Sequence, residues 1–316
     1  MLTTKPRSGF SIFEISITLL LIALIAAGAL SASRVVSYMI LNTAREDTEE
    51  SAIKYMRRDV IVWFDSTSEK SFIDSEVKNG SRISTWYETK PISTIPAAAI
   101  QNDPDKQPTY AATAINGLPA LKFDGIDDSM SITAASYVTS DAPLFYNNFS
   151  VFLVAQAKDN IVAEAESNKG ISGQKNQRYA LFPPSGDNIY PNIRDSASAG
   201  ISFGLNGISF YENSEGYTPP IMSSSAGYSR ASAILMEYKN KTPKLYVNGK
   251  QTKVGLTSIK NRVFPPFYIG GGPSPWESYG NFSGHIAEII IINRSLTKEE
   301  IDDVFSYLKK KWKLNY

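Results

Sequence analysis

Three aspartates close together in the segment FDGIDD are the residues of this chain best suited to metal chemistry. Asp124, Asp127 and Asp128 would place carboxylate oxygens around one turn. Calcium binds several oxygens from carboxylates and backbone carbonyls, often at a turn. The same residues also fit an ordinary hairpin turn, because Asp-Gly pairs favour tight turns and acids suit turns without any metal. Both interpretations, a calcium site and a simple turn, stay open at this point.

Aromatic residues in the segment GGGPSPWESYGNFSG are candidates for ligand binding. We expect this glycine- and proline-rich segment to be a loop that exposes Trp276 and Tyr279. Exposed rings at the rim of a domain can stack on sugar rings, and packing in the core is the alternative. Trp86 and Tyr87 belong to a short β-like run, where we expect Trp86 to pack in the core.

Few residues of the chain are suited to catalysis. A retaining glycosidase needs two carboxyl groups about 5 Å apart. Glu164 and Glu166 stand without a third acid, and Glu288 is alone in an apolar strand, where we expect it to be a satisfied structural carboxylate. His285 is the only histidine and begins a strand, so packing is favoured over general-base catalysis. We therefore predict no catalytic residue and no enzymatic activity.

The beginning of the chain combines a short basic leader, one carboxylate and a long apolar run. Two basic residues precede Gly9, Phe10 follows, and Glu14 stands before the apolar residues 15–32. That run would extend roughly 27 Å as a helix, close to the thickness of a bilayer core. A carboxylate at the edge of a membrane helix is expensive, so we expect Glu14 to have a partner.

The segments RSG and FSIFEISITLLLIALIAAG together resemble the start of type IV prepilins and pseudopilins. The resemblance implies cleavage between Gly9 and Phe10 by a prepilin peptidase, which also methylates the new amine. It implies that Glu14 pairs with the Phe10 amine of a neighbouring subunit in a filament. It also implies a single-pass precursor in a bacterial inner membrane, with the head in the periplasm, and later a pilus, a pseudopilus or the cell surface. An uncleaved signal anchor and a secretory signal cut near residues 29–31 are the alternatives.

The composition excludes several classes of chemistry. The 316 residues carry a net charge of +1 and include no cysteine. Because there is no basic surplus, we predict no nucleic-acid partner. Disulfides, zinc thiolates and thiol nucleophiles are excluded, so the fold must be held by its own core, which a chain of this length can bury.

The pattern of elements predicts a mainly β protein with a helix at each end. Residues 11–57 lack proline and keep helical spacing of apolar residues, which predicts one long helix. Short β-branched and aromatic runs separated by NG, DG and GG turns follow, and they predict an antiparallel sandwich. The segment LTKEEIDDVFSYLKKKW predicts a final helix, in which Thr297 and Glu300 form a capping box.

The order of these segments resembles a laminin-G-like, concanavalin A-like jelly roll from residue 60 to residue 312. The motifs are VWFDS, QPTYAATAINGLPALKFDGIDDSMSI, KLYVNGKQ and GHIAEIIIINRSLTKEEIDDVFSYLKKKW. The resemblance implies a two-sheet sandwich whose concave face or loop rim binds carbohydrate or protein, in some members with calcium. Glucanases of this fold carry a Glu-X-Asp-X-X-Glu motif, which this sequence lacks.

Together these features predict three segments: a leader (1–9), an assembly helix (10–58) and a jelly-roll head (59–316). We expect a minor pilin or pseudopilin of a type IV pilus or type II secretion system. Its partners would be the prepilin peptidase, other pilin subunits, the inner membrane, and a glycan or surface protein bound by the head. The alternative is a membrane-anchored, divergent glycoside hydrolase.

Overall fold

A computed structural model describes residues 12–89, 97–133, 145–185 and 195–316, without the side chains of residues 12–14, 27–31 and 33. The chain forms two compact units, residues 1–43 and residues 44–316. Gly9 and Phe10 lie outside the described residues, as does the side chain of Glu14.

The first helix, α1, spans Ile12–Glu50. The sequence predicted a helix as far as residue 57, but the chain changes conformation at Ser51, which has extended backbone angles. The Ser51 hydroxyl donates to the carbonyl of Thr48 at 2.8 Å, a local hydrogen bond that competes with continuation of the helix. A 3-10 helix, η1 (Ala52–Met56), follows.

The predicted location of the chain needs correction. Among the described residues, no helix is both long and apolar enough to cross a membrane. This finding contradicts the expected single-pass precursor in a bacterial inner membrane with a periplasmic head, and the later surface location that depended on it.

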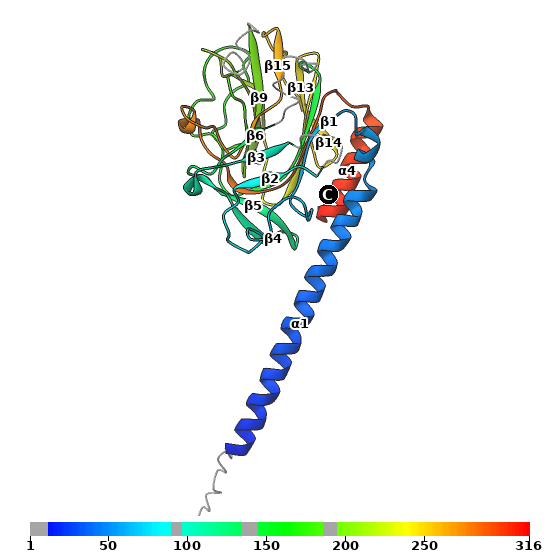
Figure 1. The fold of residues 1–316 in the computed structure, drawn as a ribbon. Helices are drawn as coiled ribbons and strands as arrows, with labels where there is room; N and C mark the ends of the chain where they lie inside the picture. The colour runs from blue at the N-terminus through cyan, green and yellow to red at the C-terminus, as the bar shows by residue number, and fades with distance from the viewer. Residues whose placement is uncertain (1–11, 90–96, 134–144, 186–194) are drawn as a thin grey trace, which may run out of the picture. The chain divides into compact units, whose positions relative to one another are not determined.

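The described part of residues 44–316 is built on two mainly antiparallel sheets (Figure 1). The first has eight described strands: β14 (Lys250–Val254), β13 (Thr242–Val247), β12 (Ser232–Lys239), β7 (Phe149–Ala157), β17 (Ser283–Ile292), β5 (Leu118–Asp124) and β4 (Thr109–Ile115) in that order, with β1 (Val60–Asp65) also paired to β17. Strand β17 is central, because β7 lies on one side of it and β5 and β1 share the other.

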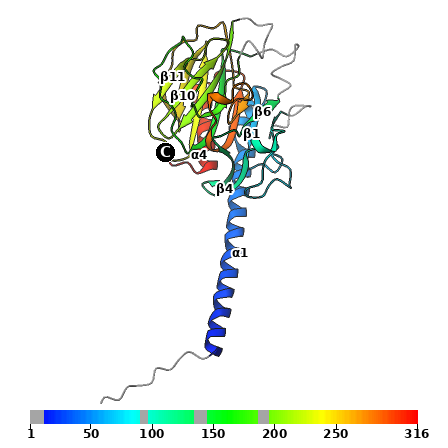
Figure 2. The same cartoon turned by 90° about the vertical axis from the view of Figure 1, so that its left-hand side faces the viewer.

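The second sheet has nine described strands. Their order is β11 (Pro220–Ser225), β10 (Gly207–Asn213), β9 (Ser196–Gly204), β8 (Tyr179–Phe182), β16 (Tyr268–Ile269), β6 (Met130–Thr133), β3 (Ala98–Ile100) and β2 (Thr85–Tyr87), and β15 (Arg262–Phe264) pairs with β9 in parallel. Strands β10 and β11 form one edge, seen in Figure 2. The predicted antiparallel sandwich is confirmed.

The core lies between the sheets and draws apolar side chains from both. Phe123 and Leu153 of the first sheet belong to the same buried cluster as Phe203 and Ile269 of the second. This is the pattern expected where the inward-facing residues of two sheets interdigitate.

The final helix, α4 (Lys298–Trp312), covers the outer face of the first sheet. The Phe305 ring lies 5.5 Å from that of Phe152, which points away from the core side of β7. The predicted capping box is confirmed: the Thr297 hydroxyl accepts from the Glu300 N–H at 3.2 Å, and Glu300 accepts from the Thr297 N–H at 2.9 Å. Hydrogen bonds from Arg294 lower the pKa of Glu300 to about 2.

Candidate binding rim

The acidic turn, residues 124–128, follows strand β5 and is folded by its own carboxylates. Asp124 Oδ1 accepts hydrogen bonds from the backbone N–H groups of Ile126 at 2.8 Å and Asp127 at 3.3 Å. Asp128 Oδ2 accepts another from the N–H of Asp124 at 2.9 Å. These are the local contacts of an aspartate-stabilised turn, and they do not require a metal.

The acidic turn also has the geometry of a cation site. One carboxylate oxygen from each of Asp124, Asp127 and Asp128 lies within 4.8 Å of the other two. Burial, followed by the charge of Asp124, raises the pKa of Asp128 to about 7. A divalent cation would offset this concentrated negative charge, and oxygen ligands suit calcium. Because calcium takes about six to eight oxygens, waters or carbonyls would have to complete the shell.

Asn281 connects the acidic turn to the loop containing Trp276. Its side-chain N–H donates to the backbone carbonyl of Ile126. The backbone carbonyl of Asn281 accepts a hydrogen bond from Arg178 Nη1 at 3.3 Å. The Asn281 Oδ1 atom is buried and has no hydrogen-bond partner among the described residues. A Cβ on Gly271 would lie 1.8 Å from this oxygen, so only glycine permits the approach. Two segments far apart in sequence are therefore held together here.

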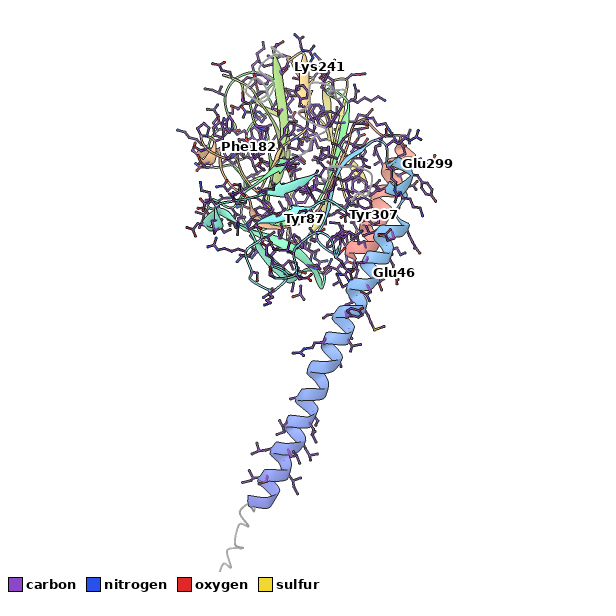
Figure 3. All side chains as sticks on the ribbon, in the orientation of Figure 1. Glu46, Tyr87, Phe182, Lys241, Glu299 and Tyr307 are labelled. Carbon is purple, nitrogen blue, oxygen red and sulfur yellow. The ribbon has the colours of Figure 1, made fainter. Side chains whose placement is uncertain are left out.

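The aromatic loop, residues 273–281, presents the two predicted rings. Trp276 directly precedes the short 3-10 helix η3 (Glu277–Tyr279), and Tyr279 is the last residue of that helix. The ring of Phe182, labelled in Figure 3, lies 6.2 Å from that of Trp276 and 5.7 Å from that of Tyr279. Both rings are partly buried and partly exposed. Packing and exposure, treated as alternatives from the sequence, occur together.

The aromatic loop is fixed to its surroundings by backbone and charge contacts. The Gln177 N–H donates to the Tyr279 carbonyl at 3.0 Å. Lys106 and Glu277 form an ion pair of 3.7 Å. A Cβ on Gly280, which has φ +119°, would lie 2.0 Å from the Gln177 carbonyl oxygen. The rings are therefore held in place before any ligand arrives. We call the acidic turn and the aromatic loop together the rim.

The other aromatic candidates do not form part of the rim contacts. Trp86 is fully buried and packs on Phe72 with ring centroids 6.0 Å apart, as predicted. Tyr87 is 39% exposed on strand β2.

The remaining polar candidates have partners of their own or are neutral. Glu164 accepts a 2.5 Å hydrogen bond from the Tyr211 hydroxyl, and Glu166 forms a 2.9 Å ion pair with Lys253. Burial and two nearby lysines lower the pKa of the half-buried His285 to about 4, so its imidazole is neutral at pH 7.

Sequence reasoning missed the cation that accompanies Glu288. Lys311 is fully buried, and its Nζ lies 3.0 Å from Glu288 Oε2. The signal was present, because Lys311 and Trp312 follow Leu308 by three and four residues and therefore lie on the apolar face of α4. Asn281 and Arg178, which join the two halves of the rim, carried no such signal.

Comparisons with known proteins find only remote structural likeness. No protein-family model matches the chain, and no curated protein matches it in sequence. Among solved structures, the chain is similar to the botulinum neurotoxin serotype D binding domain, with 11% identity, a TM-score of 0.48 and coverage of 81% of this chain and 52% of that one. It is also similar to a Trypanosoma rangeli sialidase in complex with 2,3-difluorosialic acid, with 15% identity, a TM-score of 0.47 and coverage of 86% of this chain and 38% of that one. The binding domain of Paraclostridial Mosquitocidal Protein 1 is similar with 12% identity, a TM-score of 0.47 and coverage of 80% of this chain and 53% of that one. The chain thus spans about half or less of each of these structures, and its function has to be inferred from its own side chains.

Proposed function

We propose that the head is a carbohydrate-binding domain whose ligand lies on the rim. The observation that carries this is the pair of partly exposed rings, Trp276 and Tyr279, backed by Phe182 and joined to the acidic turn through Asn281. A sugar ring has an apolar face of C–H groups, which packs on an aromatic ring. Its hydroxyl groups donate hydrogen bonds, which carboxylates accept. The rim offers both kinds of contact on a fixed framework.

Binding of the full chain to a glycan array, followed by titration with the best-bound glycan, tests this function. Trp276→Ala and Tyr279→Ala are expected to weaken binding at least about tenfold, which corresponds to about 1.4 kcal/mol. Tyr87→Ala is the matched control, because Tyr87 is also a partly exposed aromatic residue. Equal affinity in all three variants, or no glycan bound by the folded chain, contradicts the proposal.

Assembly of the chain as a pilin-like subunit is the second part of the proposal. Its support is the N-terminal sequence alone: a peptidase would cut between Gly9 and Phe10, and Glu14 would pair with the Phe10 amine of a neighbouring subunit. The mature protein would then be a pilin-like subunit, and its bulky head suits a low-copy position.

N-terminal sequencing of the mature protein tests the processing step. We expect the sequence to begin at Phe10, Gly9→Val to leave an uncleaved chain, and Glu14→Leu to be cleaved but not assembled. Normal processing and assembly in both variants exclude the pilin-like route while leaving glycan binding by the head untouched.

Hydrolysis of a glycan is the alternative activity. Tyr211 and Glu164 are in contact, but Tyr211 is fully buried and desolvation raises its pKa, which disfavours a nucleophilic phenolate. Incubation of the best-bound glycan with the protein separates the two functions: unchanged glycan supports binding, and released sugar supports hydrolysis.

A further inference from the structure

A second group of polar residues lies away from the rim, buried between α4, β17 and the end of β1. Lys311 Nζ lies 2.7 Å from Asp65 Oδ2 and 3.0 Å from Glu288 Oε2. All three side chains are at most 1% exposed. We call these three residues the charge cluster. Burying one cation with two carboxylates is costly, so the arrangement invites a functional explanation.

The charge cluster joins the two ends of the head. Asp65 is the last residue of β1, the first strand, and Lys311 lies in α4, the last element. Glu288 is paired directly opposite Asp65 in the register of β1 and β17. The chain has no cysteine, so no disulfide can join these ends.

The hydrogen bonds around Asp65 suit a carboxyl group whose carbon is attacked by a nucleophile. Its Oδ1 accepts hydrogen bonds from the Thr67 N–H at 2.9 Å and the Thr67 hydroxyl at 2.7 Å. Two fixed donors on one oxygen stabilise the negative charge that forms there when the carbon is attacked. The other oxygen, Oδ2, faces Lys311 and also accepts from the Thr48 hydroxyl at 3.0 Å.

Glu288 is fixed beside the amine. Its Oε1 accepts from Trp63 Nε1 at 2.8 Å and the Tyr307 hydroxyl at 2.6 Å, and its Oε2 accepts from Trp312 Nε1 at 2.6 Å. Burial raises the pKa of Glu288 above that of an exposed glutamate, which increases its ability to take up a proton. Tyr307, on the face of α4 that meets the sandwich, is labelled in Figure 3.

We propose that Lys311 and Asp65 form an intramolecular amide bond, with Glu288 as the proton relay. The Nζ lone pair attacks Asp65 Cγ after the ammonium passes a proton to Oδ2 along the 2.7 Å contact. The C–N bond forms and the Cγ–Oδ2 bond breaks. Glu288 takes a second proton from Nζ and returns it to the departing oxygen, which leaves as water. The amide keeps one proton, and no oxidant or other reactant is needed.

The surroundings favour this condensation. Because the fold already holds the two reacting groups in contact, the reaction step does not include the entropy cost of bringing them together. A cavity of about 470 Å³, lined in part by Thr48, Trp63 and Asp65, gives the released water a place to go.

Intact-mass spectrometry of the folded full chain tests the proposal. The expected mass is lower than the sequence requires by one water molecule. After trypsin digestion, a branched peptide should join the segment containing Asp65 to the segment containing Lys311. The bond must be located in this way, because cyclisation at an Asp-Gly pair such as Asp124 and Gly125 also removes one water.

Three variants sharpen the test. Lys311→Arg keeps a cation but removes the primary amine, and Glu288→Gln keeps the side-chain size but removes the relay, so both should have the full mass. Lys310→Arg is the control, because its exposed neighbouring amine contacts Asp47 instead, and it should still lose one water. A wild-type chain of full mass, or a loss of water mapped elsewhere, overturns the proposal even if a variant fails to fold. An unchanged branched peptide in Glu288→Gln overturns the relay.

Discussion

The rim and the charge cluster lie on opposite sides of the head, and they differ in whether their buried polar atoms have hydrogen-bond partners. In Figure 3, Phe182 beneath the rim and Tyr307 beside the charge cluster mark these two sides. In the charge cluster, all four carboxylate oxygens of Asp65 and Glu288 accept hydrogen bonds. On the rim, the buried Asn281 Oδ1 has no partner among the described residues.

This difference separates a region that holds the fold together from one that is able to bind. A buried polar atom without a partner is costly, and it persists where a ligand or water can satisfy it. A fully paired group of charges has nothing further to offer a ligand, but breaking it leaves a charge alone in the core. Substitutions in the two regions should therefore produce different effects.

The largest effect is expected from Lys311→Met. The change removes both the Lys311 cation and the amide bond proposed to form from it, and it leaves Asp65 and Glu288 as buried carboxylates without a partner of opposite charge. We expect a loss of about 3–5 kcal/mol in the free energy of unfolding. Chemical denaturation of the full chain, followed by tryptophan fluorescence, measures this. Lys310→Met is the control: Lys310 is 67% exposed and only its partner Asp47 is buried, so a smaller loss is expected than in Lys311→Met. Similar losses in the two variants would mean that the charge cluster does not stabilise the head.

A smaller, pH-dependent effect is expected at Glu212, a buried carboxylate that contacts hydroxyl groups rather than a cation. Its oxygens accept hydrogen bonds from Tyr217, Tyr238 and Ser258, and Lys241 acts only from a distance. Burial raises the pKa of Glu212 from 4.5 to about 7. The folded state therefore prefers the protonated form, and this stabilisation is complete below pH 4.5 and is lost as the pH rises through 7.

Glu212→Gln tests this sign, because glutamine resembles the protonated acid and does not titrate. The wild-type chain should lose stability relative to the variant as the pH rises from 4.5 to 7, whereas the two should differ by a constant amount below pH 4.5. Unfolding curves at a series of pH values measure the difference. A constant difference across the whole range would show that Glu212 is not protonated in the fold.

The sequence predicted those features that depend on neighbouring residues. The run GHIAEIIII became β17, and the Thr297 and Glu300 pattern became the cap of α4, since both follow from local spacing. It could not predict contacts between distant segments. Burial of Lys311 depends on Asp65 across the chain, and the connection of the two halves of the rim depends on Asn281. The helix end at Ser51 was missed because a single side-chain hydrogen bond decides it.

The smallest effect is expected at Asp124, where two substitutions separate the turn from the metal. Asp124→Asn keeps an oxygen that can accept from the N–H groups of Ile126 and Asp127, but it removes the charge. Asp124→Ala removes both. If the acidic turn binds calcium, the wild-type melting temperature should rise on addition of calcium, and both variants should lose that response. Without calcium, only the alanine variant should be destabilised, by about 1 kcal/mol.

Calorimetric titration with calcium in buffers of different ionisation enthalpy completes this comparison. Because Asp128 has a pKa of about 7, partly through the charge of Asp124, calcium should displace a proton from it near neutral pH. The wild-type chain should release that proton on binding, and Asp124→Asn should release less. If calcium changes neither the melting temperature nor the proton balance of the wild-type chain, the three carboxylates serve only the turn, and glycan recognition at the rim depends on the aromatic loop alone.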